Sequence, residues 1–412
     1  MAGISVNNPR NSTDVLIVGG GPAGLAAALA LRQRGATVTV ADARKPPLDK
    51  ACGEGLMPDS LHALAQLGVE LLPSDGAAFH GIRFVNHEKG RHSEPHETEV
   101  ATAQFPSGAR FGSGLGVGLR RQTLHARLVA QAEAAGVDLR WQSQVQLMED
   151  GRVLVAGEVH RYACLVGADG QGSRVRHWAG LDECKVLSRR FGFRQHFRVD
   201  PSACWSPFVE VHWAASGQAY VSPVGPGEVC VATLSSNQYC RVKTLLEELP
   251  QLRKRLAGGT SSPTTPLDTE RGSLTTTNRV ARVAVGSIAL IGDASGSVDA
   301  ITGEGLGIAF RQALLLAECF EIGDLERYNR LHPEILRVPQ TMARVMLLMD
   351  RSEAVRNRAL HMLAAEPAIF ARMLGVHLGS EPVGRFVATS GLEVAWRMMV
   401  QRQPSAAPGA PA

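Results

Sequence analysis

A glycine-rich turn near the start of the chain constrains the fold more than any other feature of the sequence. Gly19, Gly21 and Gly24 stand at G-x-G-x-x-G spacing, after the mostly aliphatic run of 14–18 and before the helical pattern of 25–31. In such a strand–turn–helix unit the first glycine permits the tight turn, the second lets a pyrophosphate approach the backbone, and the third lets helix and strand pack closely. The helix N-terminus then offers free N–H groups and a positive dipole end to phosphate. The segment therefore predicts a Rossmann-like βαβ unit that binds a dinucleotide.

A second predicted strand with an acidic end narrows the choice of nucleotide. Residues 37–41 have the pattern of a buried strand, and Asp42 follows directly at its end. A carboxylate in this position accepts hydrogen bonds from both ribose hydroxyls and disfavours a 2′-phosphate, so FAD or NAD is favoured over NADP. The alternative is a glycine-rich turn in an unrelated α/β fold, which the complete strand–turn–helix context disfavours.

Composition sets the general class of the protein. With 412 residues, 44% of them hydrophobic and 20% charged, the chain is long enough for two or three globular domains. Its net charge of +4 comes from scattered arginines, which argues against a nucleic-acid partner, since such a partner needs a clustered basic stripe. The cysteines form no C-x-x-C pair, and we expect no metal site. The sequence has no apolar signal-peptide region and no long apolar stretch, so we expect a cytoplasmic protein.

Hydrophobic periodicity divides the chain into three kinds of segment. The regions 14–72 and 119–181 alternate short aliphatic runs with helical patterns, as βαβ units do. The regions 79–112 and 186–236 alternate with period two, which is typical of half-buried antiparallel strands. From residue 305 onward the pattern is helical almost to the end. These patterns predict an α/β fold with an inserted antiparallel sheet and a helical C-terminal part.

Two further runs resemble the motifs of a known family. The run LVGADGQGSRVR at 165–176, with Asp169, resembles the DG motif of flavoprotein monooxygenases, and the run at 288–307, with Asp293, resembles their GD motif. Over about residues 14–325 the chain thus resembles the para-hydroxybenzoate-hydroxylase-like superfamily. This superfamily includes single-component aromatic hydroxylases, geranylgeranyl reductases and flavin-dependent halogenases. The resemblance implies FAD as the cofactor and NAD(P)H as its transient electron donor.

The resemblance also implies which residues hold FAD. Asp293 would hold the ribityl hydroxyls, Arg121 would contact the cofactor, and the backbone of Val145 would meet the adenine. The sequence CGEG at 52–55 resembles the loop beside the flavin in the geranylgeranyl reductase branch, and Cys52 is either a small buried side chain or a redox-active one. The expected cofactor-binding residues are Gly19, Gly21, Ala23, Gly24, Asp42, Cys52, Gly53, Gly55, Arg121, Val145, Asp169, Asp293, Gly303, Gly305 and Leu306. The sequence assigns no catalytic residue.

The motifs set the expected domain boundaries. The expected Rossmann-like FAD-binding domain is discontinuous and comprises 14–78, 115–185 and 278–325. The expected substrate domain, an inserted antiparallel sheet, comprises 79–114 and 186–277. A helical C-terminal region is expected over 326–402, and the polar or Pro/Ala-rich ends, 1–13 and 403–412, are expected to be disordered.

The predicted strands at 191–199 and 208–213 each have one apolar and one polar face. Phe, Val and Trp side chains alternate along them with polar residues such as Arg194 and His196. Beside a flavin the apolar face suits a small hydrophobic, aromatic, polyketide-like or isoprenoid-like substrate. The alternative is that the apolar face is core and the polar face is solvated. The expected substrate-binding residues are Trp213, Tyr220 and Pro223.

Three reactions of the superfamily remain open from the sequence. We expect an NAD(P)H-dependent monooxygenase that hydroxylates a hydrophobic aromatic or polyketide-like molecule, because the run at 165–170 is typical of that group. The alternative is a geranylgeranyl-reductase-like reductase of isoprenoid or lipid double bonds. It is favoured by the loop at 52–55 and by Gly296, which stands where hydroxylases usually carry histidine. A halogenase is disfavoured because the W-x-W-x-I-P tract is absent, and a non-enzymatic FAD-binding module is disfavoured because all three motifs are present.

The C-terminal helical pattern leaves a choice of partner. Met342, Met346 and Met349 recur at helical spacing, which usually indicates core packing or an interdomain face. A basic, methionine-rich helix also suits peripheral contact with a membrane surface or the capping of an apolar pocket, and we keep these as the second interpretation. The sequence does not specify the oligomeric state.

Overall fold

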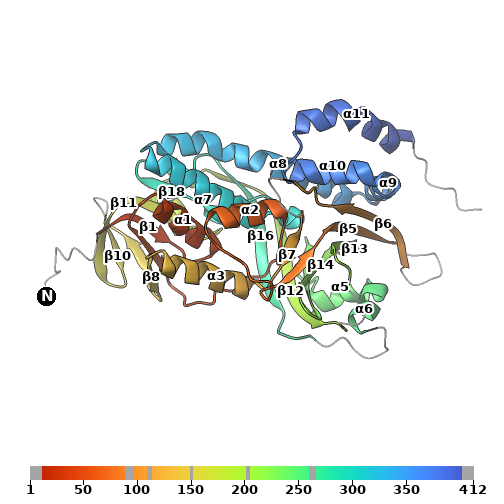
Figure 1. Ribbon diagram of the computed structural model, residues 1–412, viewed down its shortest axis with the longest axis horizontal. Coiled ribbons are helices and arrows are strands. Elements are labelled where there is room, and N and C mark those ends of the chain that lie inside the picture. The colour runs from red at the N-terminus through yellow and green to blue at the C-terminus, as the bar shows by residue number, and fades with distance from the viewer. Residues whose placement is uncertain are drawn as a thin grey trace, which may run out of the picture.

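The structure, a computed structural model, contains a mainly parallel sheet, an antiparallel sheet and a set of C-terminal helices (Figure 1). It describes residues 12–88, 96–108, 114–148, 152–200, 205–258 and 266–400. This is the predicted α/β fold, with a Rossmann-like part, an antiparallel sheet inserted into it and a helical C-terminal part.

The mainly parallel sheet is centred on the strand that precedes the glycine turn. Its path runs in the order β17-β18-β11-β1-β2-β8, and neighbours are parallel except for β17 and β18. The strands are β1 (Ser12–Val18), β2 (Val38–Asp42), β8 (Asp138–Trp141), β11 (Glu158–Gly167), β17 (Ala284–Val285) and β18 (Ile288–Leu290). The short antiparallel strands β9 (Val145–Leu147) and β10 (Arg152–Val155) join this sheet through β11.

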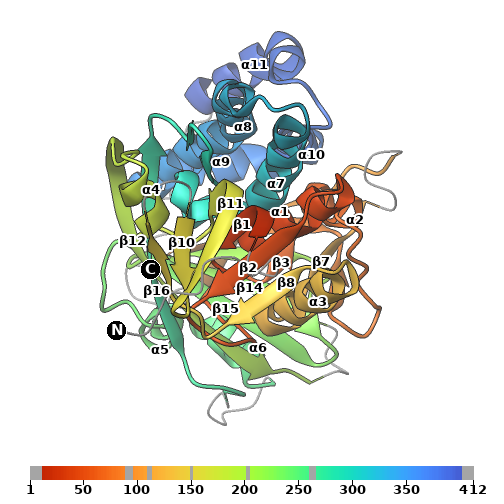
Figure 2. The ribbon, with the colours of Figure 1, turned by 90° about the vertical axis from the view of Figure 1, so that its left-hand side faces the viewer.

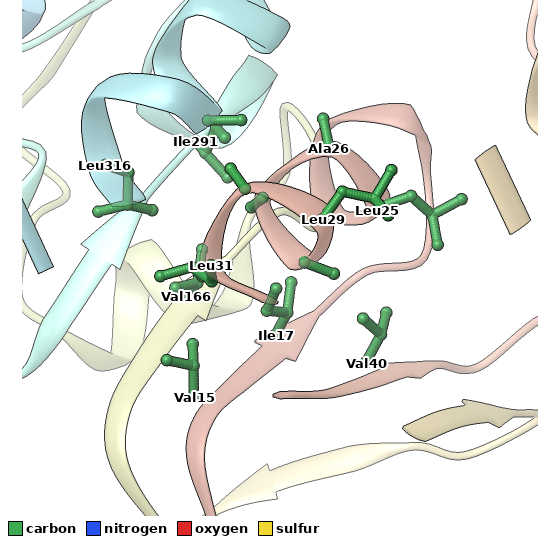
Figure 3. Close-up of a cluster of buried hydrophobic side chains, with 14 of the residues drawn as sticks. Val15, Ile17, Leu25, Ala26, Leu29, Leu31, Val40, Val166, Ile291 and Leu316 are labelled. Carbon is green, nitrogen blue, oxygen red and sulfur yellow. The ribbon is translucent and has the colours of Figure 1, made fainter. Parts of the chain in front are cut away.

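Helices cover this sheet and complete its core. The helix α1 (Pro22–Gln33) packs against α7 (Gly305–Glu321) and α3 (Arg121–Ala134), and α2 (Pro58–Gln66) packs against α7. Figure 3 shows side chains of β1, β2, α1, β11 and α7 meeting in one cluster, among them Ile17. Ile17 is fully buried, and burial of a side chain of this size contributes about 1.5–3 kcal/mol.

The antiparallel sheet has the order β16-β12-β15-β14-β13-β5-β6, in which only the pair β13 and β5 is parallel. Its strands are β5 (Gly81–Glu88), β6 (His96–Gln104), β12 (Cys184–Arg198), β13 (Val209–Trp213), β14 (Gln218–Gly225), β15 (Glu228–Ser235) and β16 (Arg271–Val280). The period-two pattern predicted all of them except β16, whose threonine-rich sequence lacks the alternation. The helices α5 (Val242–Glu247) and α6 (Pro250–Leu256) pack beside this sheet.

A small sheet connects the two large ones. It consists of β3 (Gly55–Leu56), β7 (Gly116–Gly118) and β4 (Ala77–Phe79), with β7 in the middle. Strands β4 and β7 pack against β14 of the antiparallel sheet, and β7 also packs against α2. Because β3 continues the CGEG loop, this sheet places that loop between the two parts of the molecule.

The C-terminal helices α8 (Leu325–Arg351), α9 (Glu353–Ala365), α10 (Pro367–His377) and α11 (Val383–Val400) cover one end of the antiparallel sheet (Figures 1 and 2). Helices α9 and α10 pack on β6, and their apolar side chains form one cluster with those of β5 and β13. Among the described residues, no single helix has the length and hydropathy of a membrane span. Helices α9 and α10 reach that measure only as a pair, and the pair is bent by 107°.

Candidate active site

A cavity of about 930 Å³ lies where the two large sheets and the C-terminal helices meet. Its wall includes the ends of β1 and β2, the CGEG loop, strands β13 to β15 and helices α8 to α10. This volume lies at the upper end of the range usual for ligand and cofactor sites. The cavity has a polar part at the parallel sheet and an apolar part under the C-terminal helices.

The three glycines of the turn differ in what requires them. Gly19 has φ +112°, and a Cβ there would lie 2.4 Å from the carbonyl oxygen of Ala168. A Cβ on Gly24 would lie 1.9 Å from the carbonyl oxygen of Gly19, so the protein itself excludes a side chain at both positions. At Gly21, by contrast, no atom of the described residues other than its chain neighbours lies within 4 Å of such a Cβ, although the residue lines the cavity. The glycine at 21 therefore fits close approach of a bound group to the backbone, as the pyrophosphate of FAD requires.

Asp42 lies at the end of β2 and is held by backbone N–H groups. Its Oδ2 accepts a hydrogen bond from the amide of Gly20 and its Oδ1 one from the amide of Arg44, both at 2.8 Å. The side chain is buried yet lines the cavity. Each carboxylate oxygen has a second acceptor position, so Asp42 can still bind ribose hydroxyls in a fixed orientation.

The DG and GD runs are joined to each other. Asp169 accepts hydrogen bonds from the Ser173 hydroxyl at 2.5 Å and from the Arg174 amide at 2.7 Å, so it fixes the start of α4 (Arg174–Trp178). Arg176 then donates to the carbonyl of Ala294 at 3.1 Å, in the GD run. Asp293 lines the cavity and pairs with Lys50 at 2.8 Å. Asp169 therefore shapes the loop, while Asp293 remains available to a ligand hydroxyl.

All but one of the expected cofactor-binding residues line the cavity. Gly24 is the exception, and it serves the packing of helix on strand. Arg121 contributes a buried Nε that has no hydrogen-bond partner among the residues the structure describes. The glycines at 53, 303 and 305 leave open space where a side chain would stand. This open, polar-lined backbone and the unpaired Arg121 donor fit an extended dinucleotide such as FAD.

The CGEG loop is fixed by a glutamate that the sequence did not identify as important. Glu54 has a left-handed backbone with φ +58° and a buried side chain. Its Oε1 accepts from Arg194 Nη1 at 2.7 Å and from the amide of Arg121 at 3.0 Å, and its Oε2 lies 2.6 Å from His196 Nε2. The carbonyl of Gly53 accepts from the hydroxyl of Ser222 on β14 at 2.8 Å. The loop is thus attached to the antiparallel sheet.

These contacts belong to a larger ion-pair network beneath the loop. His196 Nδ1 lies 2.6 Å from Asp268 Oδ2, and Asp49 Oδ2 binds both Arg194 at 2.9 Å and Arg271 at 2.7 Å. Burial alone would lower the pKa of His196, but its hydrogen bonds to the carboxylates of Glu54 and Asp268 raise that pKa above the ordinary value. With His196 protonated, three cations face three carboxylates, so the network carries no net charge.

Two side chains of this network belong to a group that could in principle bind a metal ion. One ligand atom each from Glu54, His196 and Cys230 lies within 4.8 Å of the others. The Glu54 carboxylate already binds Arg194, and both nitrogens of His196 face carboxylates. We therefore assign Glu54 and His196 to ion pairing.

The alternative that the polar face of the predicted strand at 191–199 is solvated is wrong for β12. Arg194 and His196 are only 2% and 1% exposed, because the CGEG loop covers this face of β12. The polar side chains pair with that loop and do not meet solvent.

Of the three expected substrate-binding residues, one lines the cavity and two do not. Tyr220 lines the cavity, and its hydroxyl lies 2.9 Å from the carbonyl of Ile301. Trp213 is not among the lining residues, since Phe84, whose ring centroid lies 5.0 Å away, covers its indole. Pro223 also lies outside the lining, because side chains alternate along β14 and its even-numbered neighbours face the cavity.

The apolar part of the cavity is walled by the C-terminal helices, an arrangement that the sequence offered only as a second interpretation. Every side chain that α8, α9 and α10 contribute to the lining is apolar except His377. The apolar ones are Met342, Val345, Met346, Met349, Leu363, Phe370, Met373 and Leu374. We call this part the apolar chamber. The methionine spacing was its only sequence signal, and that spacing is equally typical of core packing.

Comparison with known proteins agrees with this site. Residues 12–321 match the family described as FAD binding domain. The menaquinone reductase of Mycobacterium tuberculosis is 29% identical over 341 residues, covering 77% of this chain and 78% of that protein. Digeranylgeranylglycerophospholipid reductase 1 of Methanopyrus kandleri is 30% identical over 318 residues, covering 72% of this chain and 77% of that protein.

Solved structures show the same fold. A geranylgeranyl bacteriochlorophyll reductase-like protein from Thermoplasma acidophilum has a TM-score of 0.66 and 19% identity, over 93% of this chain and 99% of that one. A probable FAD-dependent monooxygenase from Pseudomonas aeruginosa has a TM-score of 0.64 and 19% identity, over 83% of this chain and 96% of that one. These likenesses confirm the architecture and do not separate the two reactions.

Proposed function

Because the chain belongs to the FAD binding domain family and is an FAD-dependent oxidoreductase, we propose that it reduces a carbon–carbon double bond of a lipophilic, isoprenoid-like substrate. The observation that carries this proposal is the apolar chamber, which is continuous with the cofactor part of the cavity. An isoprenoid chain gains roughly 25 cal/mol for each Å² of apolar surface buried there, so it binds without a charged anchor.

A backbone feature favours this reaction over hydroxylation. Gly296 lines the cavity with φ +107°, and a Cβ there would lie 2.9 Å from the carbonyl oxygen of Asn278. This backbone does not accommodate the histidine that hydroxylases usually carry at the corresponding position. The names of the two curated relatives support the same choice, because menaquinone and digeranylgeranylglycerophospholipid both contain isoprenoid chains.

In this proposal the chain positions the reactants and excludes water. When bound, FAD supplies a hydride that originates from NAD(P)H. Asp42 and the backbone at Gly21 orient the nucleotide, the CGEG loop supports the flavin end, and the chamber side chains hold the double bond in a dry environment. Burial raises the pKa of the Cys52 thiol, so this loop presents a neutral thiol to the cavity.

Hydroxylation of a hydrophobic aromatic molecule is the second candidate. It is favoured by the run at 165–170, which is typical of the monooxygenases. The two reactions differ in oxygen demand and in product mass, so one experiment separates them.

The test is incubation of the FAD-loaded protein with NADH or NADPH and either menaquinone or geranylgeraniol, with and without oxygen. A product that gains two hydrogens on its isoprenoid chain under anaerobic conditions, and keeps them when any quinol is reoxidised to the quinone, supports the reductase. A product that gains one oxygen atom and forms only in air identifies the protein as a monooxygenase and refutes the reductase proposal. Absence of product from both probes also refutes the reductase proposal. The substitution Met346→Glu in the chamber should abolish turnover while FAD is retained. The matched change Leu348→Glu, at an exposed position on α8 outside the cavity lining, should leave turnover intact.

We also propose that α11 contacts a lipid surface, from which such a substrate would be taken. Phe386 and Val394 of this helix pack against the apolar cluster that includes side chains of α9 and α10, while Leu392 and Trp396 are 88% and 63% exposed. The helix itself lies at the outer edge of the molecule (Figure 1). Tryptophan is well suited to the membrane interface. Sedimentation with phosphatidylglycerol vesicles should fall at least several-fold in a Leu392→Ser/Trp396→Ser variant. Unchanged vesicle binding, or a dimer that dissociates in this variant, would refute the lipid assignment.

A further inference from the structure

Four ionisable side chains meet beside the apolar chamber, at the first turns of α7. Arg311 on α7 pairs with Asp59 on α2 at 2.8 Å. Glu304, which directly precedes α7, places its Oε1 3.7 Å from His377 Nε2 at the end of α10 and 3.9 Å from Arg311 Nη2. Asp59 and Glu304 are 4% and 2% exposed. None of these four residues was identified from the sequence.

Glu304 is the acid of this cluster that lacks a hydrogen bond to any described residue. Neither of its carboxylate oxygens has a hydrogen-bond partner among the described residues, whereas Asp59 has a direct bond to Arg311. An ionised carboxylate without hydrogen bonds is strongly disfavoured in a protein interior. Burial raises the pKa of Glu304 to about 8, and the negative charge of Asp59 raises it as well. The positive charge of Arg311 and the hydroxyl of Thr302 lower this pKa, but their effect is smaller. At neutral pH Glu304 is therefore a carboxylic acid.

His377 connects this acid to the chamber. Glu304 does not line the cavity, but His377 does, and it is the one polar side chain that α8, α9 and α10 give to the lining. Burial lowers the pKa of His377 to about 4, so the ring is neutral near pH 7. A neutral imidazole carries one N–H donor and one acceptor nitrogen, so it can accept a proton at one nitrogen while releasing one from the other.

We propose that Glu304 is an internal acid that supplies a proton, through His377, to the substrate in the apolar chamber. This inference rests on the proposed double-bond reduction, which needs one hydride and one proton. One new C–H bond forms with the hydride that the bound cofactor supplies, and the π electrons of the double bond form the second with a proton from His377. At the same time Glu304 gives its proton to Nε2 of His377. After product release, water in the chamber protonates Nδ1 of His377 and Nε2 returns its proton to Glu304, which restores the starting state. His377 is then the catalytic residue, and Glu304 acts through it.

The pH dependence follows from the groups that face Glu304, which are Asp59 from α2, Thr302, Arg311 from α7 and His377 from α10. The active form has Glu304 protonated and His377 neutral. The rate of double-bond reduction should therefore fall as the pH rises through about 8, where Glu304 loses its proton.

The experiment separates proton delivery from cofactor binding. Wild type, Glu304→Gln, Glu304→Asp and His377→Asn are loaded with FAD, and the dissociation constant of FAD and the rate of flavin reduction by NAD(P)H are measured first. Both should change by less than about twofold in the variants. Single-turnover reduction of the isoprenoid double bond of menaquinone by the pre-reduced enzyme, measured after reoxidation of any quinol, should then be slower by about 10²–10⁴ in Glu304→Gln, the usual contribution of a positioned acid. Glu304→Asp should recover part of the rate, and the alkaline fall of the wild type should vanish in Glu304→Gln.

An infrared titration gives a readout that needs no substrate. The carbonyl band of a protonated carboxylic acid should be present in the wild type at pH 7, disappear near pH 8 and be missing from Glu304→Gln. The matched change Glu318→Gln, at a half-exposed glutamate on the same helix that pairs with Arg327, should leave this band and the turnover rate unchanged. Because Glu304→Gln preserves size and the infrared band reports on the wild type, the test does not depend on the folding of the His377 variant.

The outcomes are distinct. If the wild type reduces the isoprenoid double bond of menaquinone and Glu304→Gln reduces it equally fast with the same pH profile, the proton route is refuted. An ionised Glu304 throughout pH 5–9 would also refute it. If the wild type reduces neither menaquinone nor geranylgeraniol, the proposed function fails and proton delivery fails with it, whatever the infrared titration says of the acid.

Discussion

Replacing Glu54 by glutamine should lower the free energy of unfolding by about 3–5 kcal/mol, the usual cost of removing one partner from a buried ion pair. The carboxylate of Glu54 is fully buried and lies 2.7 Å from Arg194 and 2.6 Å from His196. Glutamine keeps the shape of the side chain but leaves the network with an excess positive charge. Two charge-assisted hydrogen bonds at about 1.5–3 kcal/mol each give a similar total. Asp49 and Asp268 still bind the two cations, so the cost should not exceed this range.

The effect should depend on pH through His196. Its pKa is raised in the folded protein, so the stability that its protonation adds is fully present below the unfolded value of 6.5 and is lost as the pH rises through the folded value. The difference between wild type and Glu54→Gln should therefore be largest near pH 6 and smaller at pH 9. The contact with Arg194 persists at both values, so a difference should remain.

Urea unfolding followed by tryptophan fluorescence, with the apo protein at pH 6 and pH 9, measures this change. A double-mutant cycle with His196→Asn tests whether the two side chains act together. If they do, His196→Asn should lower the free energy of unfolding less in the Glu54→Gln background than in wild type. Glu318→Gln on the surface of α7 is the matched control and should change stability by less than about 0.5 kcal/mol. A Glu54→Gln variant as stable as this control, or strictly additive effects of Glu54 and His196, would refute the assigned network.

Three further predictions concern the cofactor site. Asp42→Ala should weaken FAD binding by a factor of about 10 to 10⁴, since one or two charge-assisted ribose hydrogen bonds at about 1.5–3 kcal/mol each are lost. Unchanged affinity in a flavin fluorescence titration would contradict the ribose assignment. Gly21→Ala should fold as well as wild type but bind FAD poorly. Gly24→Ala should impair folding of the apo protein, because its methyl group would overlap the carbonyl of Gly19. Equal thermal unfolding of the two apo variants would show this reasoning to be wrong. Cys52→Ala should leave NAD(P)H-dependent flavin reduction intact, because burial keeps Cys52 a neutral thiol, and loss of reduction in a stopped-flow measurement would assign it a redox role.

The features that could be predicted from the sequence are those encoded in short segments. The spacing of Gly19, Gly21 and Gly24 and the acid at Asp42 depend on one βαβ unit, and period-two alternation depends on single strands. The structure places these elements as the sequence predicted. The FAD assignment needed more, namely the order of three motifs along the chain.

The features that could not be predicted depend on contacts between distant segments. Glu54 meets Arg194 and His196 from a strand far along the chain, and nothing in the sequence near Glu54 indicates those partners. Trp213 had the expected apolar strand face, but whether it or Phe84 borders the cavity depends on how α10 packs on the sheet. Glu304 stands in a glycine-rich motif whose glycines indicate only a backbone that binds the cofactor. The proposed acid function of Glu304 requires His377, which comes from a different helix.

The order of strands in the parallel sheet has a consequence for synthesis on the ribosome. Val15 of β1 pairs with Val38 of β2 on one side and with Cys164 of β11 on the other, and Leu165 of β11 pairs in turn with Ile288 of β18. A nascent chain can form the first pair early, but the sheet that carries the nucleotide site stays incomplete until β18 has left the exit tunnel. Pairing of such distant strands is slow, because the intervening loop must close first. Capture of the cofactor is therefore a late event in the life of the nascent chain, and until then the edge of β11 at residues 165–167 is open to aggregation and to chaperones.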